Sequence, residues 1–154
     1  MIALTARRGR VALRLTAERL GDDLAVTVSG GDRAHIGAVA VSQPRPGRGG
    51  EPATGATTSV LALLGHREDE LARKIAARLA AATRGAVCVA CGVHVDGIVA
   101  GEIRDVLELG DALAERLLAR LATGGRGRAA QRASSSHHRR SQVPKRRKPR
   151  RSTA

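Results

Sequence analysis

Large apolar residues occupy every second position in two early segments of the chain, Arg10–Thr16 and Leu24–Gly30. This period of two predicts β-strands with one buried and one exposed face. The segment between them contains Gly21-Asp22-Asp23, which suits a hairpin connection. The pattern therefore predicts an antiparallel strand pair near the start of the fold.

Three further segments also have the composition of strands: Ile36–Ser42, Thr57–Gly65 and Ala86–Val95. The last two are continuous apolar runs, which are typical of strands covered on both faces. Gln43–Thr54 is rich in Pro and Gly and predicts a surface loop.

Two later segments change to a helical period. Glu68–Ala82 and Glu102–Leu121 carry apolar residues three or four positions apart, with Gly85 and Gly124-Gly125 as expected stops. The predicted order is four strands, a helix, a strand and a helix. We expect an α/β (α+β) fold, in which a mixed sheet of about five strands carries two packed amphipathic helices.

Charge divides the chain into two parts. Of its 27 Lys and Arg residues, 11 lie in residues 124–154, which contain no Asp or Glu; the first 123 residues then hold 16 basic and 14 acidic side chains. We expect a folded domain over 1–123 and a disordered basic tail over 124–154. The tail has no aromatic residues for base stacking, so we expect it to bind nucleic acid only non-specifically.

Composition limits both the expected cellular location of the protein and the kinds of side chain that can bind a ligand. The N-terminus lacks the apolar region of a secretory signal, and no apolar run is long enough to span a bilayer. We expect a cytoplasmic protein with no membrane association. Because the chain has no Phe, Tyr or Trp, any flat or anionic ligand must be held by imidazole, guanidinium, aliphatic and backbone groups.

The most versatile of these groups are three histidines, His35, His66 and His94, each expected where a strand meets a turn. Asp96 follows His94 by two residues, a spacing that places both side chains on one face of extended backbone. The three residues could be simple turn residues or could line one site. Their spacing, 31 and then 28 residues, carries no local metal signature, and we assign no metal ligands.

Two other features have plain structural explanations. The segment Gly65-His66-Arg67 precedes a helix start that could hold an anion, but Glu68 and the next two acidic residues already complement the helix dipole. Cys88 and Cys91, three apart in a strand, are expected to be buried and inert and to point to opposite faces.

The segments AHIGAVAVSQPRP, TTSVLALLGHREDELARKIA and GVHVDGI, in this order and followed by an amphipathic helix, resemble the LpdD-like prenylated-flavin chaperone family. The resemblance covers about Leu13 to Leu121. It implies a small, non-catalytic protein that carries prenylated FMN, or FMN, and assists the maturation of a prenylated-FMN-dependent decarboxylase, with homo-oligomerisation possible. The family motifs fall on His35, Gly37, Gly65, His66, Glu68, Asp69, His94 and Asp96. We expect the cofactor to be bound by His35, Gly37, Gly65, His66, Arg67, His94 and Asp96, with Arg67 as a positive charge for the phosphate.

Two alternatives stay open from the residues themselves. One is a small hydrolase or lyase in which His66 or His94 acts as general base with Asp96. The other is a nucleic-acid-associated protein that acts through the basic tail.

Overall fold

A computed structural model describes residues 1–45 and 55–139. The elements, in chain order, are β1 (Ile2–Arg8), β2 (Val11–Leu20), β3 (Asp23–Gly31), β4 (Ala38–Pro44), β5 (Ala56–Ala62), α1 (Asp69–Thr83), β6 (Val87–His94) and α2 (Ala100–Arg139). The chain divides into two units, Met1–Arg120 and Leu121–Ala154, and the sheet lies in the first.

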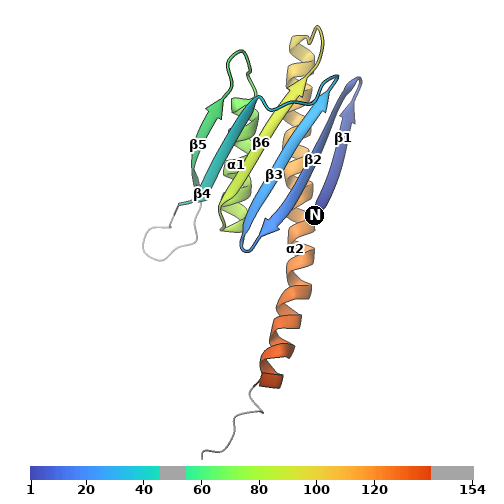
Figure 1. Ribbon diagram of the computed structural model, residues 1–154. Coiled ribbons are helices and arrows are strands. Elements are labelled where there is room, and N and C mark those ends of the chain that lie inside the picture. Colours follow the sequence, from blue (N-terminus) through green and yellow to red (C-terminus); the bar gives the residue numbers. More distant parts are fainter. Residues whose placement is uncertain (46–54, 140–154) are drawn as a thin grey trace, which may run out of the picture. The chain divides into compact units, whose positions relative to one another are not determined.

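The six strands form one mixed sheet in the order β1-β2-β3-β6-β4-β5. Neighbouring strands are antiparallel except β3 and β6, which run parallel with Gly31 opposite His94. The α+β class and the mixed sheet are therefore confirmed. The last strand of the sequence, β6, lies in the middle of the sheet (Figure 1).

The core lies between one face of the sheet and the two helices. Alternate residues of β2 and β3 are buried, as their period of two predicted, and they face the apolar sides of α1 and of α2 up to Arg120 (Figure 1). The largest fully buried side chains are those of Leu13, Leu15, Ile75, Leu79, Leu113 and Leu117. Because the chain has no aromatic residues, the core is built from leucine, valine, isoleucine and alanine, together with Cys91.

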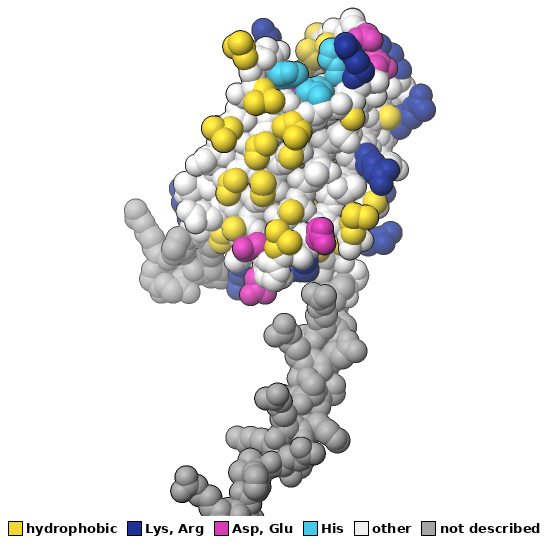
Figure 2. Space-filling model, in the orientation of Figure 1, with side chains coloured by type: hydrophobic (Ala, Val, Ile, Leu, Met, Phe, Trp, Pro, Cys, Tyr) yellow, Lys and Arg dark blue, Asp and Glu magenta, His cyan; other side chains and the backbone are white. Residues whose placement is uncertain are grey.

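Among the described residues of the first unit, no helix covers the opposite face of the sheet. Figure 2 shows this face, over which apolar side chains are spread, while the histidines gather at one end. Val41 and Leu61 are among its large exposed apolar residues, at 51% and 76% exposure.

Several sequence predictions need correction. The strand β1 was missed, because its only fully buried side chain is Leu4 and two arginines end it. The apolar run in β5 was expected to be covered on both faces, but β5 is an edge strand whose residues are exposed or half-buried. An apolar edge strand and a central one have the same composition, so the sequence could not separate them.

The helix ends also differ from expectation. The residue after α1 is Arg84, in the left-handed conformation with φ 61°, and its N–H donates to the carbonyl of Ala80; Gly85 follows it. The second helix continues through Gly124-Gly125 to Arg139 instead of ending there. Residues 46–54 of the expected loop and residues 140–154 of the expected disordered tail lie outside the described residues.

Among the described helices, none combines the length and apolar character that crossing a bilayer requires.

Candidate functional site

Three connections meet at one end of the sheet. The parallel strands β3 and β6 end there, at Gly31 and His94, while β4 begins and β5 ends there. His35 lies between β3 and β4, His66 lies between β5 and α1, and His94 is the last residue of β6. The topology thus brings together three segments that are about 30 residues apart in the sequence.

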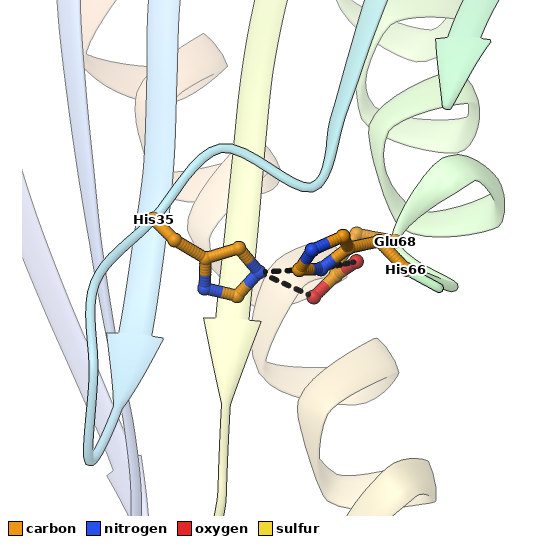
Figure 3. A group of neighbouring side chains, drawn as sticks. All are labelled: His35, His66 and Glu68. Atoms are coloured by element: carbon orange, nitrogen blue, oxygen red, sulfur yellow. Dashed lines mark hydrogen bonds and ion pairs between the residues drawn. The ribbon is translucent and has the colours of Figure 1, made fainter. Parts of the chain in front are cut away.

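The three imidazoles are close neighbours. The ring centroids of His35 and His66 lie 4.6 Å apart, and those of His35 and His94 lie 6.2 Å apart. Nε2 of His35 is 2.9 Å from Nδ1 of His66 (Figure 3). The three histidines therefore lie together at this end of the sheet, and their contact with a cofactor stays a prediction.

Glu68, a family motif position that was not among the expected cofactor-binding residues, is also a member of this cluster. It was expected to complement the dipole of the first helix, yet it lies at the N-cap position just before α1 and makes no side-chain capping bond. Its carboxylate lies 3.2 Å from His35 Nε2 and 3.7 Å from His66 Nδ1 (Figure 3). The spacing His66-Arg67-Glu68 was the available signal, because it placed an imidazole and a carboxylate two residues apart.

Backbone groups hold this carboxylate in place. The N–H of Val93 donates to Oε1 at 3.3 Å, and the N–H of Arg67 donates to Oε2 at 3.0 Å. Glu68 is thereby tied both to its own turn and to the end of β6. Hydrogen bonds of this kind fix the direction in which the remaining lone pairs point.

Two glycines leave the room that the cluster needs. A Cβ atom on Gly37 would lie 2.2 Å from the Glu68 carboxylate, and one on Gly92 would lie 2.0 Å from the carbonyl oxygen of His35. Any larger residue at either position would force one of these groups to move. Gly37, expected to contact a cofactor, therefore also has a structural role, which is to make space for Glu68.

A second group of polar side chains surrounds His94. Its Nε2 lies 2.8 Å from Oδ1 of Asp96 and 2.6 Å from Nη2 of Arg33, so it donates to the carboxylate or accepts from the guanidinium according to its tautomer. Arg33 also forms an ion pair with Asp96 at 3.1 Å, and Asp32 accepts the backbone N–H of Asp96. The expected pairing of His94 with Asp96 is thus present.

The pKa of Asp96 lies below its ordinary value. The main cause is the hydrogen bond from His94, followed by the hydrogen bond and charge of Arg33. The carboxylate therefore stays ionised and continues to orient the imidazole over the neutral pH range. His66, the other histidine proposed to work with Asp96, contacts His35 and Glu68 instead.

The remaining expected residues lie in the turn before α1. Gly65 has a positive φ of 83°, which favours glycine, and the N–H of His66 donates to the carbonyl of Leu63. Arg67 is exposed, and its backbone N–H holds Glu68. Both residues shape the turn that presents His66.

A shallow hollow of about 440 Å³ lies over β1, β2 and the end of β3, and none of the histidines lines it. It is bordered by Arg7 and Arg14, by the backbone of Gly30 and Gly31, and by Ala34, the residue before His35. Guanidinium groups and exposed backbone are the kinds of group that bind phosphate. The hollow thus combines possible anion contacts with aliphatic surface.

The two cysteines lie on opposite faces of β6, as their spacing predicted. Cys91 is buried, but Cys88 is exposed, so the expectation of two buried thiols is wrong for Cys88. Burial raises the pKa of the Cys91 thiol to about 12, and the nearby Glu68 carboxylate acts in the same direction. Cys91 is consequently an inert core residue.

Comparison with known protein families gives one match. No curated protein matches the sequence significantly. Residues 7–122 match the family described as the prenylated flavin chaperone LpdD-like domain, a range that includes His35, His66, Glu68, His94 and Asp96. Because this match spans most of the chain, the protein belongs to the prenylated flavin chaperone LpdD-like family.

Proposed function

We propose that this protein is a non-catalytic carrier of prenylated FMN that assists the maturation of a prenylated-FMN-dependent decarboxylase. The observation that carries the proposal is the family membership over residues 7–122, together with the gathering of the motif histidines at one end of the sheet. The family name gives the ligand class, and the geometry offers one place where several polar groups can meet it.

The flavin is proposed to extend from the hollow over β1, β2 and β3 to the histidine cluster. Arg14, with Arg7 beside it, would meet the phosphate, and the glycine backbone of Gly30-Gly31 would allow close approach. The imidazoles of His35 and His94 would then lie at the isoalloxazine end. Aliphatic and imidazole surfaces must hold the ring system, because the chain contains no aromatic residues.

The shape of this region suits a carrier. The hollow is shallow and lies on an exposed sheet face, so a ligand there keeps much of its surface accessible to an acceptor protein. Enzymes more often enclose their ligands and bury most of the ligand surface. A partly exposed ligand can be transferred without the unfolding of its carrier.

The test is direct binding of reduced prenylated FMN to the full-length protein without oxygen, followed by absorbance or calorimetry. We expect His35→Ala, His66→Ala, His94→Ala and Arg14→Ala each to weaken binding by about tenfold, the usual effect of losing a hydrogen bond to a charged group. Arg19→Ala is the matched control, since Arg19 lies in the same strand as Arg14 but at its other end, opposite Leu24. This variant should bind like the wild type.

A second measurement addresses the acceptor and the enzymatic alternative. The loaded protein should activate an apo-decarboxylase, while alone it should convert no aromatic carboxylic acid. Absence of flavin binding together with absence of decarboxylase activation would refute the carrier function. Turnover without a partner protein would favour the alternative in which His94 and Asp96 act in general base catalysis.

A further inference from the structure

The inference concerns the donor atoms of His35, His66 and Glu68, which converge on one point. The ligand atoms that the three side chains offer lie within 4.8 Å of one another. The shortest separations are 2.9 Å between the two imidazole nitrogens and 3.2 Å between His35 Nε2 and the carboxylate. For metal–ligand bonds of about 2.0–2.1 Å, two ligands of one ion lie about 2.9 Å apart at a right angle and about 3.4 Å apart at the tetrahedral angle.

The hydrogen bonds around the cluster leave its lone pairs directed inward. Nδ1 of His35 lies 3.4 Å from the carbonyl oxygen of Arg33, and because a carbonyl only accepts, this nitrogen carries the proton. Nε2 then presents a lone pair toward Nδ1 of His66, at 2.9 Å, and toward the Glu68 carboxylate, at 3.2 Å. A cation bound among these three groups satisfies the lone pair and the carboxylate together, and an imidazole whose other nitrogen donates to a backbone carbonyl is the usual arrangement in metal sites.

The carboxylate is oriented in the same way. Both oxygens of Glu68 accept backbone N–H groups, from Val93 and Arg67, and Gly37 leaves the space in which the carboxylate lies. The side chains are between 12% and 34% exposed, so the site is held by the fold but open to solvent. Two imidazoles and one carboxylate are a ligand set used for Zn²⁺ and similar ions, with open positions for water or substrate.

We propose that His35 Nε2, His66 Nδ1 and the Glu68 carboxylate bind one divalent first-row transition-metal ion such as Zn²⁺, and that its remaining coordination positions are open to an oxygen ligand. This differs from the sequence prediction, which assigned no metal ligands. His94 is not a ligand, because it lies outside the group of converging donor atoms and its Nε2 contacts Asp96 and Arg33. The site does not depend on flavin binding.

The experiment uses full-length protein that has been freed of metal with a chelator and contains no flavin. Calorimetric titration with Zn²⁺ should show one tight equivalent, and Co²⁺ should give visible d–d absorption bands of a site with nitrogen and oxygen ligands. His35→Ala, His66→Ala and Glu68→Ala should each lower the affinity of this equivalent by about 100-fold or more, as loss of a ligand exceeds the loss of a second-shell partner. His94→Ala is the matched control and should keep it.

A second measurement uses the wild-type protein, so that the test does not depend on variants that could fail to fold. Long-range ¹H–¹⁵N spectra of the imidazoles should show Zn²⁺-dependent shifts of Nε2 of His35 and Nδ1 of His66, with both rings in defined tautomers. The proposal is overturned if no single tight equivalent binds, or if binding persists in all three ligand variants and depends instead on His137 and His138. Because no flavin is present, these outcomes leave the carrier function to its own test, in which His94→Ala and Arg14→Ala do not touch the metal ligands.

Discussion

Cys88 and Cys91, three residues apart in β6, differ in burial and therefore in the chemistry of their thiols. Cys88 lies on the open face of the sheet, while Cys91 lies in the core with 1% exposure. Burial, followed by the charge of Glu68, raises the pKa of Cys91 from 9.0 to about 12. Because of this shift, the free energy of unfolding changes with pH in the alkaline range.

We predict that the Cys91 thiol lowers stability above pH 9. Below that pH the thiol is protonated in both states, but between pH 9 and pH 12 the unfolded chain loses this proton and the folded chain keeps it. The free energy of unfolding should then fall by about 1.4 kcal/mol per pH unit relative to Cys91→Ala. Urea unfolding at pH 8 and pH 10 measures this difference. Cys88→Ala should keep the wild-type dependence, and equal slopes in wild type and Cys91→Ala would contradict the prediction.

The residue scale also shows what the sequence could and could not reveal about the site. From the sequence, each of the three histidines could be placed at a strand end, but not on one shared edge of the sheet. Glu68 could be placed in a family motif but not in contact with the histidines, since an acidic residue at a helix start already has a sufficient explanation in the helix dipole. Its contact with His35 and Val93 depends on tertiary structure that no local pattern contains.

At the scale of elements, the connection that carries His35 lies directly against the end of β6. Gly37 donates its N–H to the carbonyl of Cys91, and the carbonyl of His35 lies where a side chain of residue 92 would be. The site therefore depends on the absence of a side chain in a neighbouring strand. This requirement can be tested without changing any proposed ligand.

We predict that Gly92→Ala lowers the free energy of unfolding by about 1–3 kcal/mol, because the new methyl group must displace the backbone at His35. It should also weaken binding at the histidine cluster. Gly101→Ala is the control: Gly101 lies in α2 with nothing within 4 Å of an added Cβ, so this change should raise stability by about 0.5–1 kcal/mol. Thermal unfolding of both variants measures the effect, and a neutral Gly92→Ala would contradict the close packing.

Prediction of elements from the sequence succeeded where period and length agreed. The alternation in β2 and β3 and the four-residue spacing in α1 correspond to their buried faces. The spatial order of the strands, in which β6 lies between β3 and β4, was not predicted, because nothing in a strand's own sequence specifies its neighbours. The strand β1 was missed because Leu4 is its only buried residue.

At the scale of the whole molecule, charge and the candidate site lie in different parts of the chain. The candidate site falls within Met1–Arg120, whereas 11 of the 27 basic residues lie in residues 124–154. One deletion can therefore test the basic segment separately from the candidate site. The basic segment would act on phosphates through charge alone, and its effect should decrease with salt.

We predict that removal of residues 124–154 abolishes retention of RNA or DNA at low salt and leaves flavin binding and the circular dichroism of the sheet intact. A chain in which this segment is replaced by Gly and Ser of equal length is the control for length. Gel-shift titrations over a range of salt concentrations measure the first effect. Unchanged retention after the deletion would show that the tail is not the nucleic-acid contact.

The central place of β6 also sets the order in which the site can come into existence during synthesis. β3 and β4 leave the ribosome well before Val87, yet they become neighbours of a continuous sheet only when β6 fills the gap between them. His35 and His66 precede that strand. Val93, whose N–H holds the Glu68 carboxylate, and Gly92, which packs against the carbonyl of His35, belong to it. A nascent chain that ends before β6 therefore contains His35 and His66 but lacks the strand that positions His35 and Glu68. The site can form only after β6 has been synthesised.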